Sequence, residues 1–501
     1  MNGHKRRRRV LVADLNNSAR YPTHSVGYFV AVLRGAGWDV DVFSPFLTGV
    51  SGVVREQPAS PWSLLAARLG YRCAVSPRPW AKRIRAGVAS LLAPQLARAT
   101  RRVARLFEER LDQEPRVDAV LVSTYLMYLP LCQAMAAACR GRGIPLLLGS
   151  AGFTQPNVAL EWLAINGVTA LAAGELETEV PAILEAMLLG DDLAKFQGLW
   201  LRGEGGPRDG IAPPRRDLDG VPFPDFSDFP WDRYPNRIIP VITGRGCGWG
   251  VCTFCSDIVT AAGRTYRSRS PESVLEGLRV QSERYGTKLF AFTDLKLNSN
   301  LELWHALIER FQAVVPGARW IGAVHIDAQG ANGLSGEALR AARAGMVRLT
   351  TGLESGSQRL LDAMKKGTDL EVTSARLRDA RDAGISVRTT MIIGYPGETP
   401  KDLETTRDFL RVHRDCIDRI NLNRFQIMTG TVFHRQWMKR PQAFPGVADV
   451  RPNHRMAQME HRLLAAASRK YLRAVDSVLS EVHAINRRPI LEVARDFEGV
   501  M

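Results

Sequence analysis

Three cysteines crowd into nine residues near the middle of the chain, and they constrain its fold more than any other feature. Cys247, Cys252 and Cys255 form a glycine-rich C-x4-C-x2-C loop directly after an apolar strand predicted over residues 237–243. Three thiolates on such a loop are typical of iron–sulfur clusters and zinc sites. Structural zinc takes four protein ligands, and no other Cys or His lies within forty residues on either side. The pattern therefore favours a [4Fe–4S] cluster that keeps one iron open to a small molecule.

The region around this loop has a repeated strand–helix pattern. Six such units are predicted between residues 237 and 438, with strands near 237–243, 288–293, 320–325, 347–352, 385–393 and 420–428. A closed (β/α)8 barrel needs ~250 residues, so six units predict a partial (β/α)6 barrel. Active sites of these barrels lie at the carboxyl ends of the strands, where the cysteine loop is expected.

The first 203 residues predict a second parallel sheet, doubly wound and Rossmann-like. A helix is predicted at His24–Gly35, and strands near 10–13, 38–43, 119–123, 145–148 and 170–173. Residues 48–85 are expected to form an irregular insertion, and residues 86–110 a long basic amphipathic helix. Ligands of such sheets bind outside the carboxyl ends of the strands.

Composition marks two further parts of the chain. Residues 204–236 are rich in Gly, Pro, Asp and Arg, and we predict a linker between the N-terminal domain at 1–203 and the barrel at 237–438. Residues 439–501 are basic, and we expect a helical C-terminal region that packs on the barrel.

Net charge and cysteine content indicate which partners and which cellular compartment to expect. The 67 Lys and Arg outnumber the 51 Asp and Glu, giving a net charge of +16, which favours anionic partners. Seven cysteines with this clustering do not form a disulfide framework, so a reducing, cytoplasmic compartment is expected. No signal peptide is visible. The uncharged stretch 119–139 is interrupted by polar residues and predicts a strand, loop and helix, so no transmembrane segment is expected.

Residues 237–430 resemble the radical S-adenosylmethionine (SAM) enzymes. Phe254 is the aromatic residue that this family places before the third cysteine, and the segments Thr351–Ser357 (TGLESGS) and Met391–Thr399 (MIIGYPGET) also match. The usual motif has three residues between the first two cysteines. This loop has four, as in members that carry an N-terminal cobalamin-binding domain. The resemblance implies that Cys247, Cys252 and Cys255 ligate a [4Fe–4S] cluster whose open iron binds SAM.

The resemblance also implies SAM contacts at three strand ends. Asp294 ends the second strand of the barrel, Glu354 and Ser355 end the fourth, and Gly394 ends the fifth. Helix capping or ion pairing is the alternative for the two acids, and a simple turn is the alternative for Gly394.

The N-terminal sheet resembles the cobalamin-binding domain of such enzymes. The implied contacts follow successive strands and are His24, Gly27, Ser123, Thr124, Gly149, Ser150, Gly174 and Glu175. Small residues there would let the corrin and its nucleotide tail approach the backbone. Mutase-type domains ligate cobalt through D-x-H-x-x-G, but here Pro22 replaces the Asp. His24 is therefore either a cobalt ligand or, as favoured, a loop-packing or tail-contacting residue. A sheet that binds nothing is the alternative for the domain.

Together these resemblances predict a cobalamin-dependent radical SAM methyltransferase. It would transfer a methyl group to an unactivated carbon or phosphorus of a natural-product or peptide substrate through a 5′-deoxyadenosyl radical. The alternative keeps both cofactors but ends in oxidation, cyclisation or rearrangement. A small-molecule or peptide substrate is expected, anionic if Arg245, Arg388 or Arg424 receives it, and an acidic flavodoxin or ferredoxin as electron donor. Nucleic acid is not expected, because no RNA-binding signature is present.

Overall fold

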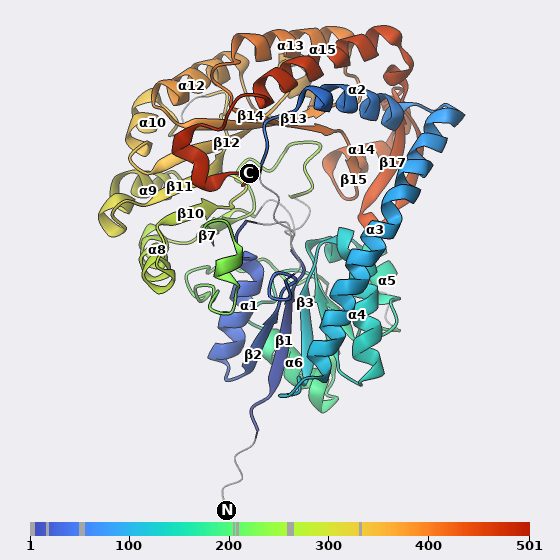
Figure 1. Ribbon diagram of the computed structural model, residues 1–501, viewed down its shortest axis with the longest axis vertical. Helices are drawn as coiled ribbons and strands as arrows, with labels where there is room; N and C mark the ends of the chain where they lie inside the picture. Colours follow the sequence, from blue (N-terminus) through green and yellow to red (C-terminus); the bar gives the residue numbers. More distant parts are fainter. Residues whose placement is uncertain are drawn as a thin grey trace, which may run out of the picture.

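The computed structural model describes residues 6–16, 20–49, 56–203, 206, 210–257, 265–329 and 333–500. Figure 1 shows two stacked α/β units, the N-terminal sheet below and the barrel above, joined along one side by the long helix α3. The carboxyl ends of both sheets lie toward the junction between the units, which is where ligands of such sheets bind.

The N-terminal sheet has the strand order β2-β1-β3-β4-β5-β6 and is parallel except for the edge strand β6. Alternate residues of the central strands pack against α1 and α6 on one face and against α3, α4 and α5 on the other. This confirms the predicted doubly wound sheet, although β6 was not expected. The strands are β1 (Arg9–Asp14), β2 (Asp39–Phe43), β3 (Ala119–Ser123), β4 (Leu146–Gly149), β5 (Ala170–Ala172) and β6 (Leu199–Leu201). The helices are α1 (His24–Gly35), α2 (Pro61–Val75), α3 (Pro79–Asp112), α4 (Leu129–Gly141), α5 (Pro156–Leu163) and α6 (Val180–Leu189).

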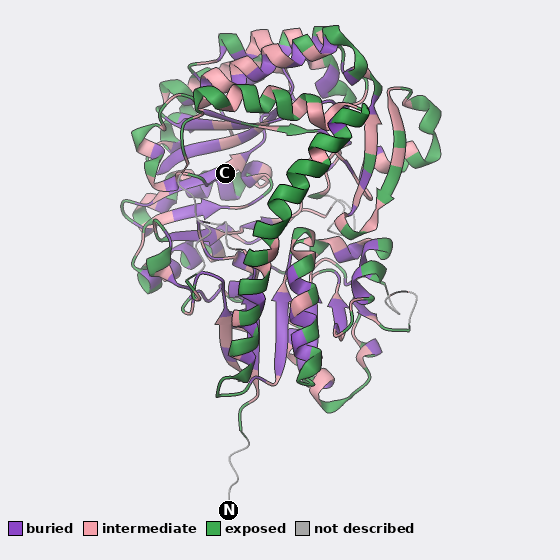
Figure 2. Cartoon of the chain, turned by 45° about the vertical axis from the view of Figure 1, so that its right-hand side comes forward, coloured by how far each residue is buried: buried purple, intermediate pink, exposed green. Residues whose placement is uncertain are grey.

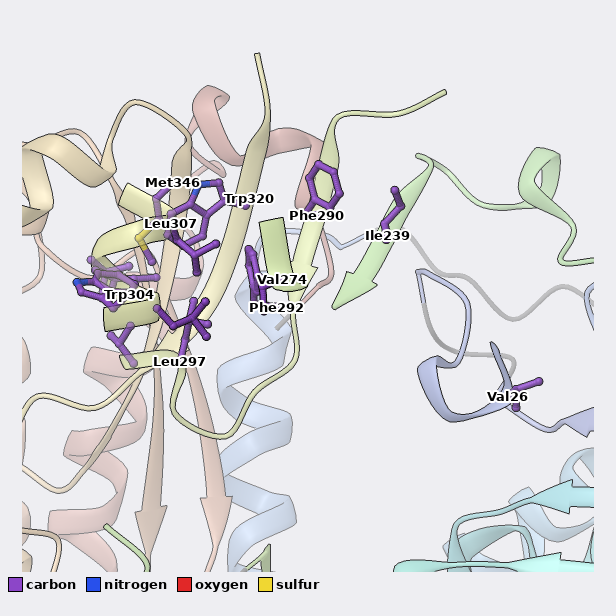
Figure 3. Close-up of a cluster of buried hydrophobic side chains, with 14 of the residues drawn as sticks. Val26, Ile239, Val274, Phe290, Phe292, Leu297, Trp304, Leu307, Trp320 and Met346 are labelled. Carbon is purple, nitrogen blue, oxygen red and sulfur yellow. The ribbon is translucent and has the colours of Figure 1, made fainter. Parts of the chain in front are cut away.

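The second sheet has the order β14-β13-β12-β11-β10-β7 and is parallel throughout, which confirms the predicted partial barrel of six units. Its core lies between the strands and the outer helices, and Figure 3 shows Phe290, Phe292, Trp304 and Trp320 packed there. The strands are β7 (Ile238–Val241), β10 (Leu289–Phe292), β11 (Arg319–Val324), β12 (Met346–Glu354), β13 (Ser386–Ile393) and β14 (Arg419–Arg424). The helices are α8 (Pro271–Tyr285), α9 (Leu301–Val314), α10 (Gly336–Ala342), α11 (Gln358–Ala363), α12 (Leu370–Asp382) and α13 (Pro400–Val412).

The segment predicted as a linker is part of the hydrophobic core where the structure describes it. Phe226 and Phe229 are buried in a cluster that contains residues of both sheets. The backbone N–H of Phe226 donates to the Tyr285 hydroxyl of α8 at 2.7 Å, and Arg34 of α1 donates to Asp225 at 2.8 Å. The segment therefore packs the two units together instead of separating them.

The insertion predicted to be irregular is helical between residues 61 and 85. Helix α2 packs on α15 (Arg469–Asn486), where Arg68 donates to the Ser480 hydroxyl. Helix α3 begins at Pro79, earlier than predicted, and ends against α4. Proline at the first turn of each helix fits a start at these positions.

The C-terminal region is only partly helical, so that prediction is corrected. Its strands β16 (Val447–Asn453) and β17 (Gln458–Leu463) form an antiparallel sheet with β15 (Ile427–Met428) of the preceding segment, whereas α15 and the 3-10 turn Glu492–Phe497 are helical. Helix α14 (Val432–Lys439) leads into the region. The apolar spacing around Met459 and Leu463 was compatible with a helix. Ladder pairing with β15 and β16 decides for a strand instead.

The last described residues close the amino end of the barrel. Arg348 of β12 is fully buried and donates to the carbonyl oxygens of Ala494, Phe497 and Val500 at 2.7–3.0 Å. None of the helices in the described ranges has the length and hydropathy needed to cross a bilayer.

Candidate active site

The cysteine loop is held at the carboxyl edge of the barrel by contacts to the segment after β12. A short hairpin of β8 (Gly244–Arg245) and β9 (Arg267–Ser268) precedes and follows it. The Trp249 indole N–H donates to the Lys365 carbonyl at 2.9 Å, and the Thr253 N–H donates to the Met364 carbonyl at 2.9 Å. The Thr253 hydroxyl lies 2.8 Å from that of Tyr395, just after β13. These contacts anchor the peptide that carries the cysteines to the end of the sheet.

The donor set of this loop fits an iron–sulfur cluster. Cys247, Cys252 and Cys255 are partly exposed and are not joined in disulfide bonds. The described residues contain no group of three or more His, Cys, Asp or Glu side chains gathered to hold a metal ion. Three soft thiolates spread along one loop suit a larger inorganic cluster better than a single ion. Burial raises the pKa of Cys252 to about 11, and the Lys366 ammonium opposes this, so a nearby cation already favours the thiolate.

Asp294 organises the start of the cysteine loop. Its buried carboxylate accepts hydrogen bonds from the Thr243 N–H at 3.0 Å, the Thr243 hydroxyl at 2.8 Å and the Gly244 N–H at 2.7 Å. Burial raises the pKa of Asp294 to about 6 against the lowering effect of these hydrogen bonds. The structure thus places this residue beside the loop, with its oxygens directed to the backbone that leads to Cys247.

Glu354 sits at the end of β12 in a left-handed backbone conformation, with φ of 57°. Such a conformation is uncommon for a non-glycine residue and marks strained positions. Its buried carboxylate accepts from the Lys366 ammonium at 2.9 Å, and that ammonium lies 6.0 Å from the centre of the Phe254 ring. Lys366 connects the predicted SAM residue Glu354 with the cysteine loop. This lysine was not predicted from the sequence, because no local motif surrounds it.

Ser355 and Gly394 lie on the same edge of the barrel. The Ser355 hydroxyl is 3.2 Å from that of Thr406 and accepts from the Ser357 N–H. Gly394 has φ of 82°, which glycine adopts without strain, and its N–H donates to Glu398 at 2.9 Å. Burial raises the pKa of Glu398 to about 7. Glu354, Ser355 and Gly394 therefore lie at the carboxyl ends of the neighbouring strands β12 and β13, whereas Asp294 lies after β10.

The corresponding edge of the N-terminal sheet carries small polar residues. The Ser123 hydroxyl is 3.0 Å from that of Ser25, the Thr124 N–H donates to the Gly149 carbonyl, and the Ser150 hydroxyl accepts from the Gly152 N–H. A Cβ added at Gly149 would meet nothing nearer than the Val122 carbonyl oxygen at 4.0 Å. This glycine therefore leaves open space at the sheet edge.

Two buried polar atoms at this edge have no hydrogen-bond partner among the residues that the structure describes. One oxygen of Asp14, the last residue of β1, is unpaired, whereas the other accepts from the Thr23 hydroxyl at 2.7 Å. The Nδ1 atom of His24 is likewise unpaired. Burial raises the pKa of Asp14 to about 6 and lowers that of His24 to about 3. Unsatisfied buried groups at the ligand edge of a doubly wound sheet fit a polar ligand that would pair with them.

Three predicted cobalamin residues also have clear packing roles. The His24 ring packs edge-on against Tyr28, with the ring centres 4.4 Å apart. A Cβ at Gly27 would come within 2.3 Å of the Phe226 ring, and one at Gly174 within 2.6 Å of the Ala212 carbonyl oxygen. Both glycines therefore allow close approach of the segment that joins the two units.

Glu175 connects the two ligand edges directly. It follows β5 and forms ion pairs at 2.9 Å with Arg245 and Arg267, which flank the cysteine loop. Arg245 also pairs with Glu177 at 2.9 Å. Because Arg245 lies two residues before Cys247, these ion pairs hold the cysteine loop against the edge of the N-terminal sheet.

A cavity of about 260 Å³ opens at the carboxyl ends of β13 and β14. Basic groups outnumber acidic ones in its lining, which contains Tyr71, Lys82, Arg85, Gly394, Arg424, Asp449, Arg451, Glu460, His461 and Arg462. Of the three arginines proposed to receive an anionic substrate, only Arg424 lines this cavity. Arg245 pairs with Glu175, and Arg388 pairs with Glu56 at the lining of a separate cavity.

Comparison with known proteins shows what the barrel region is similar to. Residues 241–410 match the model of the radical SAM superfamily. The chain is 25% identical over 305 residues to the uncharacterized methyltransferase PH0819 of Pyrococcus horikoshii, an alignment that covers 60% of this chain and 64% of that protein.

Two solved structures share the fold over nearly the whole chain. TsrM of Kitasatospora setae, a radical SAM methyltransferase solved with cobalamin and a [4Fe–4S] cluster bound, superposes with a TM-score of 0.61 at 17% identity and covers 89% of this chain and 81% of its own. The cobalamin-dependent radical SAM enzyme OxsB, solved with aqua-cobalamin and SAM, gives 0.63 at 14% identity and covers 92% and 65%. Residues 241–410 therefore match the radical SAM superfamily, and the N-terminal sheet and barrel together have the fold of TsrM and OxsB.

Proposed function

We propose that the protein is a cobalamin-dependent radical SAM methyltransferase. One observation carries the proposal: the cysteine loop of the barrel and the ligand edge of the N-terminal sheet meet at the Arg245–Glu175 ion pair. Two cofactors held at these edges would lie in one junction, as a reaction that uses both requires. The methyltransferase name of PH0819 and the cofactors in the TsrM and OxsB structures support the same interpretation.

The residues divide the work between the two edges. Cys247, Cys252 and Cys255 would ligate the cluster, and Glu354, Ser355 and Gly394 surround the place for SAM beside it. When bound, the cluster and SAM supply a radical that abstracts hydrogen, and cobalamin supplies a methyl group. The protein positions these groups, excludes water and sets the charges around them.

The N-terminal edge would receive cobalamin. Gly149 leaves room for close approach, and the unpaired atoms of Asp14 and His24 would each gain a hydrogen-bond partner. The His24 ring packs against Tyr28, which favours a contact between His24 and the periphery of cobalamin over ligation of the cobalt by His24.

The cavity beside Gly394 is the proposed place for the substrate. Lys82, Arg85, Arg424, Arg451 and Arg462 give it an excess of positive charge over Asp449 and Glu460. Such a surface selects a substrate that carries a carboxylate or phosphate group.

Anaerobic reconstitution tests the proposal without knowledge of the substrate. The full chain, loaded with iron, sulfide and cobalamin, is incubated with a reductant and SAM labelled with deuterium in its methyl group. We expect 5′-deoxyadenosine, S-adenosylhomocysteine, and label transferred to the bound cobalamin. Formation of 5′-deoxyadenosine without S-adenosylhomocysteine or labelled cobalamin would instead support a radical reaction without methyl transfer.

A further inference from the structure

The hairpin of α2 and α3 leaves a large apolar surface uncovered. Twenty large hydrophobic side chains are exposed in the described residues, and nine of them lie between residues 62 and 96. They are Trp62, Leu65, Leu69, Trp80, Ile84, Val88, Leu91, Leu92 and Leu96. Contiguous exposed apolar surface is rare and usually marks an interaction site.

The exposed side chains follow helical stripes on elements whose other contacts are already made. On α2, Trp62, Leu65 and Leu69 recur at helical spacing, while Arg68 and Arg72 on the same helix bind Ser480 and Asp476 of α15. This helix is therefore fixed to the barrel through one face and open on another.

Helix α3 bridges the two units, and its first half has almost no cover. Trp80, Ile84, Val88 and Leu91 recur at spacings of three or four, and Leu91 is 77% exposed. Only the second half packs on the N-terminal domain, through buried residues such as Phe107. Figure 2 shows the helix crossing the front of the molecule with most of its length exposed.

The charge of this hairpin is one-sided. Residues 57–107 contain ten of the chain's 67 Lys and Arg and none of its 51 Asp and Glu. Arg83, Arg98, Arg101 and Arg102 are exposed, and within the described ranges they form no ion pair. No local acid neutralises these guanidinium groups.

Together, an apolar stripe, two tryptophans and unpaired arginines specify the chemistry of the partner. Basic amphipathic helices with aromatic residues lie in the headgroup region of bilayers, with the apolar side chains at the acyl boundary and the cations against anionic headgroups. Nucleic acid would satisfy the arginines but leave the leucines in water. An apolar protein surface would satisfy the leucines but not the charge.

We propose that the α2–α3 hairpin docks the enzyme on the surface of a bilayer that contains anionic lipid. The helices lie on the membrane and do not cross it. This inference does not depend on the methyl-transfer reaction, because the hairpin residues it uses lie outside the cofactor sites.

Vesicle co-sedimentation tests the proposal with the full chain. Unilamellar vesicles of phosphatidylcholine alone are compared with an equal mixture of phosphatidylcholine and phosphatidylglycerol. We expect at least tenfold tighter binding to the mixed vesicles, roughly the contribution of one to two basic residues near such a surface, and weaker binding as salt is raised.

Two hairpin variants separate the apolar and charged contributions. Leu91→Gln with Leu96→Gln removes two exposed leucines, and Arg98→Gln with Arg101→Gln and Arg102→Gln removes three charges. Each should reduce binding to mixed vesicles by roughly tenfold or more, since each removes at least one membrane contact. The matched control is Leu189→Gln with Val412→Gln, which changes exposed side chains elsewhere and should bind like the wild type. Circular dichroism checks that all variants are folded.

Two results would overturn the proposal. One is equal or absent binding to the two vesicle types, and the other is binding that the hairpin variants leave unchanged. Light scattering completes the test: a wild-type dimer that the leucine variant splits, without vesicle binding, would assign this surface to a second copy of the chain.

Discussion

The two ligand edges that meet at the domain junction are built from the same kind of parallel sheet, yet selected buried polar side chains at the two edges differ in whether they have protein partners. At the barrel edge, Asp294 accepts three hydrogen bonds and Glu354 is paired with Lys366. At the N-terminal edge, Asp14 and His24 each have a buried atom that no described residue pairs with. Asp294 and Glu354 are therefore oriented by the protein itself, whereas Asp14 and His24 would gain partners from a ligand.

The largest expected effect comes from breaking the barrel edge alone. Replacing Cys247, Cys252 or Cys255 by alanine removes a cluster ligand and should lower SAM cleavage by roughly a thousandfold or more. Iron content and visible absorbance measure the cluster, and cobalamin binding should persist. Cys73→Ala, which changes a partly exposed thiol outside the loop, should keep the cluster. Normal iron in all three loop variants would contradict the ligand assignment.

The next largest effect is expected from removing the Arg245 ion pairs that connect the two edges. Arg245→Met leaves the largely buried Glu177 without its partner and should lower the free energy of unfolding by about 3 kcal/mol. Urea denaturation measures this loss. The control Arg279→Met removes pairs on the surface of α8 and should cost less than about 1 kcal/mol. Equal losses in both variants would show that the interdomain pairs contribute no more than surface pairs.

A smaller effect is expected on the pH dependence of stability, which tests the incomplete hydrogen bonding of Asp14 at the N-terminal edge. Burial raises the pKa of Asp14 from 3.8 to about 6, so the folded state holds its proton more tightly than the unfolded state. Stability from this group is present below 3.8 and is lost as pH rises through about 6. Asp14→Asn keeps the acceptor oxygen and should be about 2 kcal/mol more stable than the wild type above this range, with the difference shrinking in acid. A difference that is independent of pH would contradict the shift.

The smallest effect compares two glycines of the same edge. Gly149→Ala enters open space and should change stability by less than about 0.5 kcal/mol, while weakening cobalamin binding. Gly27→Ala meets the Phe226 ring and should cost about 1–2 kcal/mol, with less effect on affinity. Thermal unfolding and cobalamin titration separate the two outcomes. Unchanged cobalamin affinity in Gly149→Ala would remove this glycine from the proposed site.

The sequence predicted the parts of the site that depend on neighbouring residues. The cysteine spacing, the helix at His24–Gly35 and the order of the strands follow from local patterns, and both sheets have the expected parallel arrangement. The Lys366–Glu354 and Arg245–Glu175 ion pairs depend on how separate segments fold against each other, so no local sequence pattern predicted them.

The errors have the same origin. The residues around Met459 and Leu463 had apolar spacing compatible with a helix, and pairing of β17 with β15 and β16 places them in a sheet. The Gly- and Pro-rich segment before the barrel resembled a flexible connection, yet Phe226 and Phe229 are buried in it. In both cases tertiary contacts outweighed local propensity.

The buried guanidinium of Arg348 gives the barrel a late step in assembly. During synthesis, β12 emerges about 150 residues before the carbonyl groups that receive this arginine. Until then its charge must remain hydrated, so the amino end of the barrel stays wet and open while the upstream domain can already be folded. The amino end of the barrel is therefore closed only when residues 494–500 have been added.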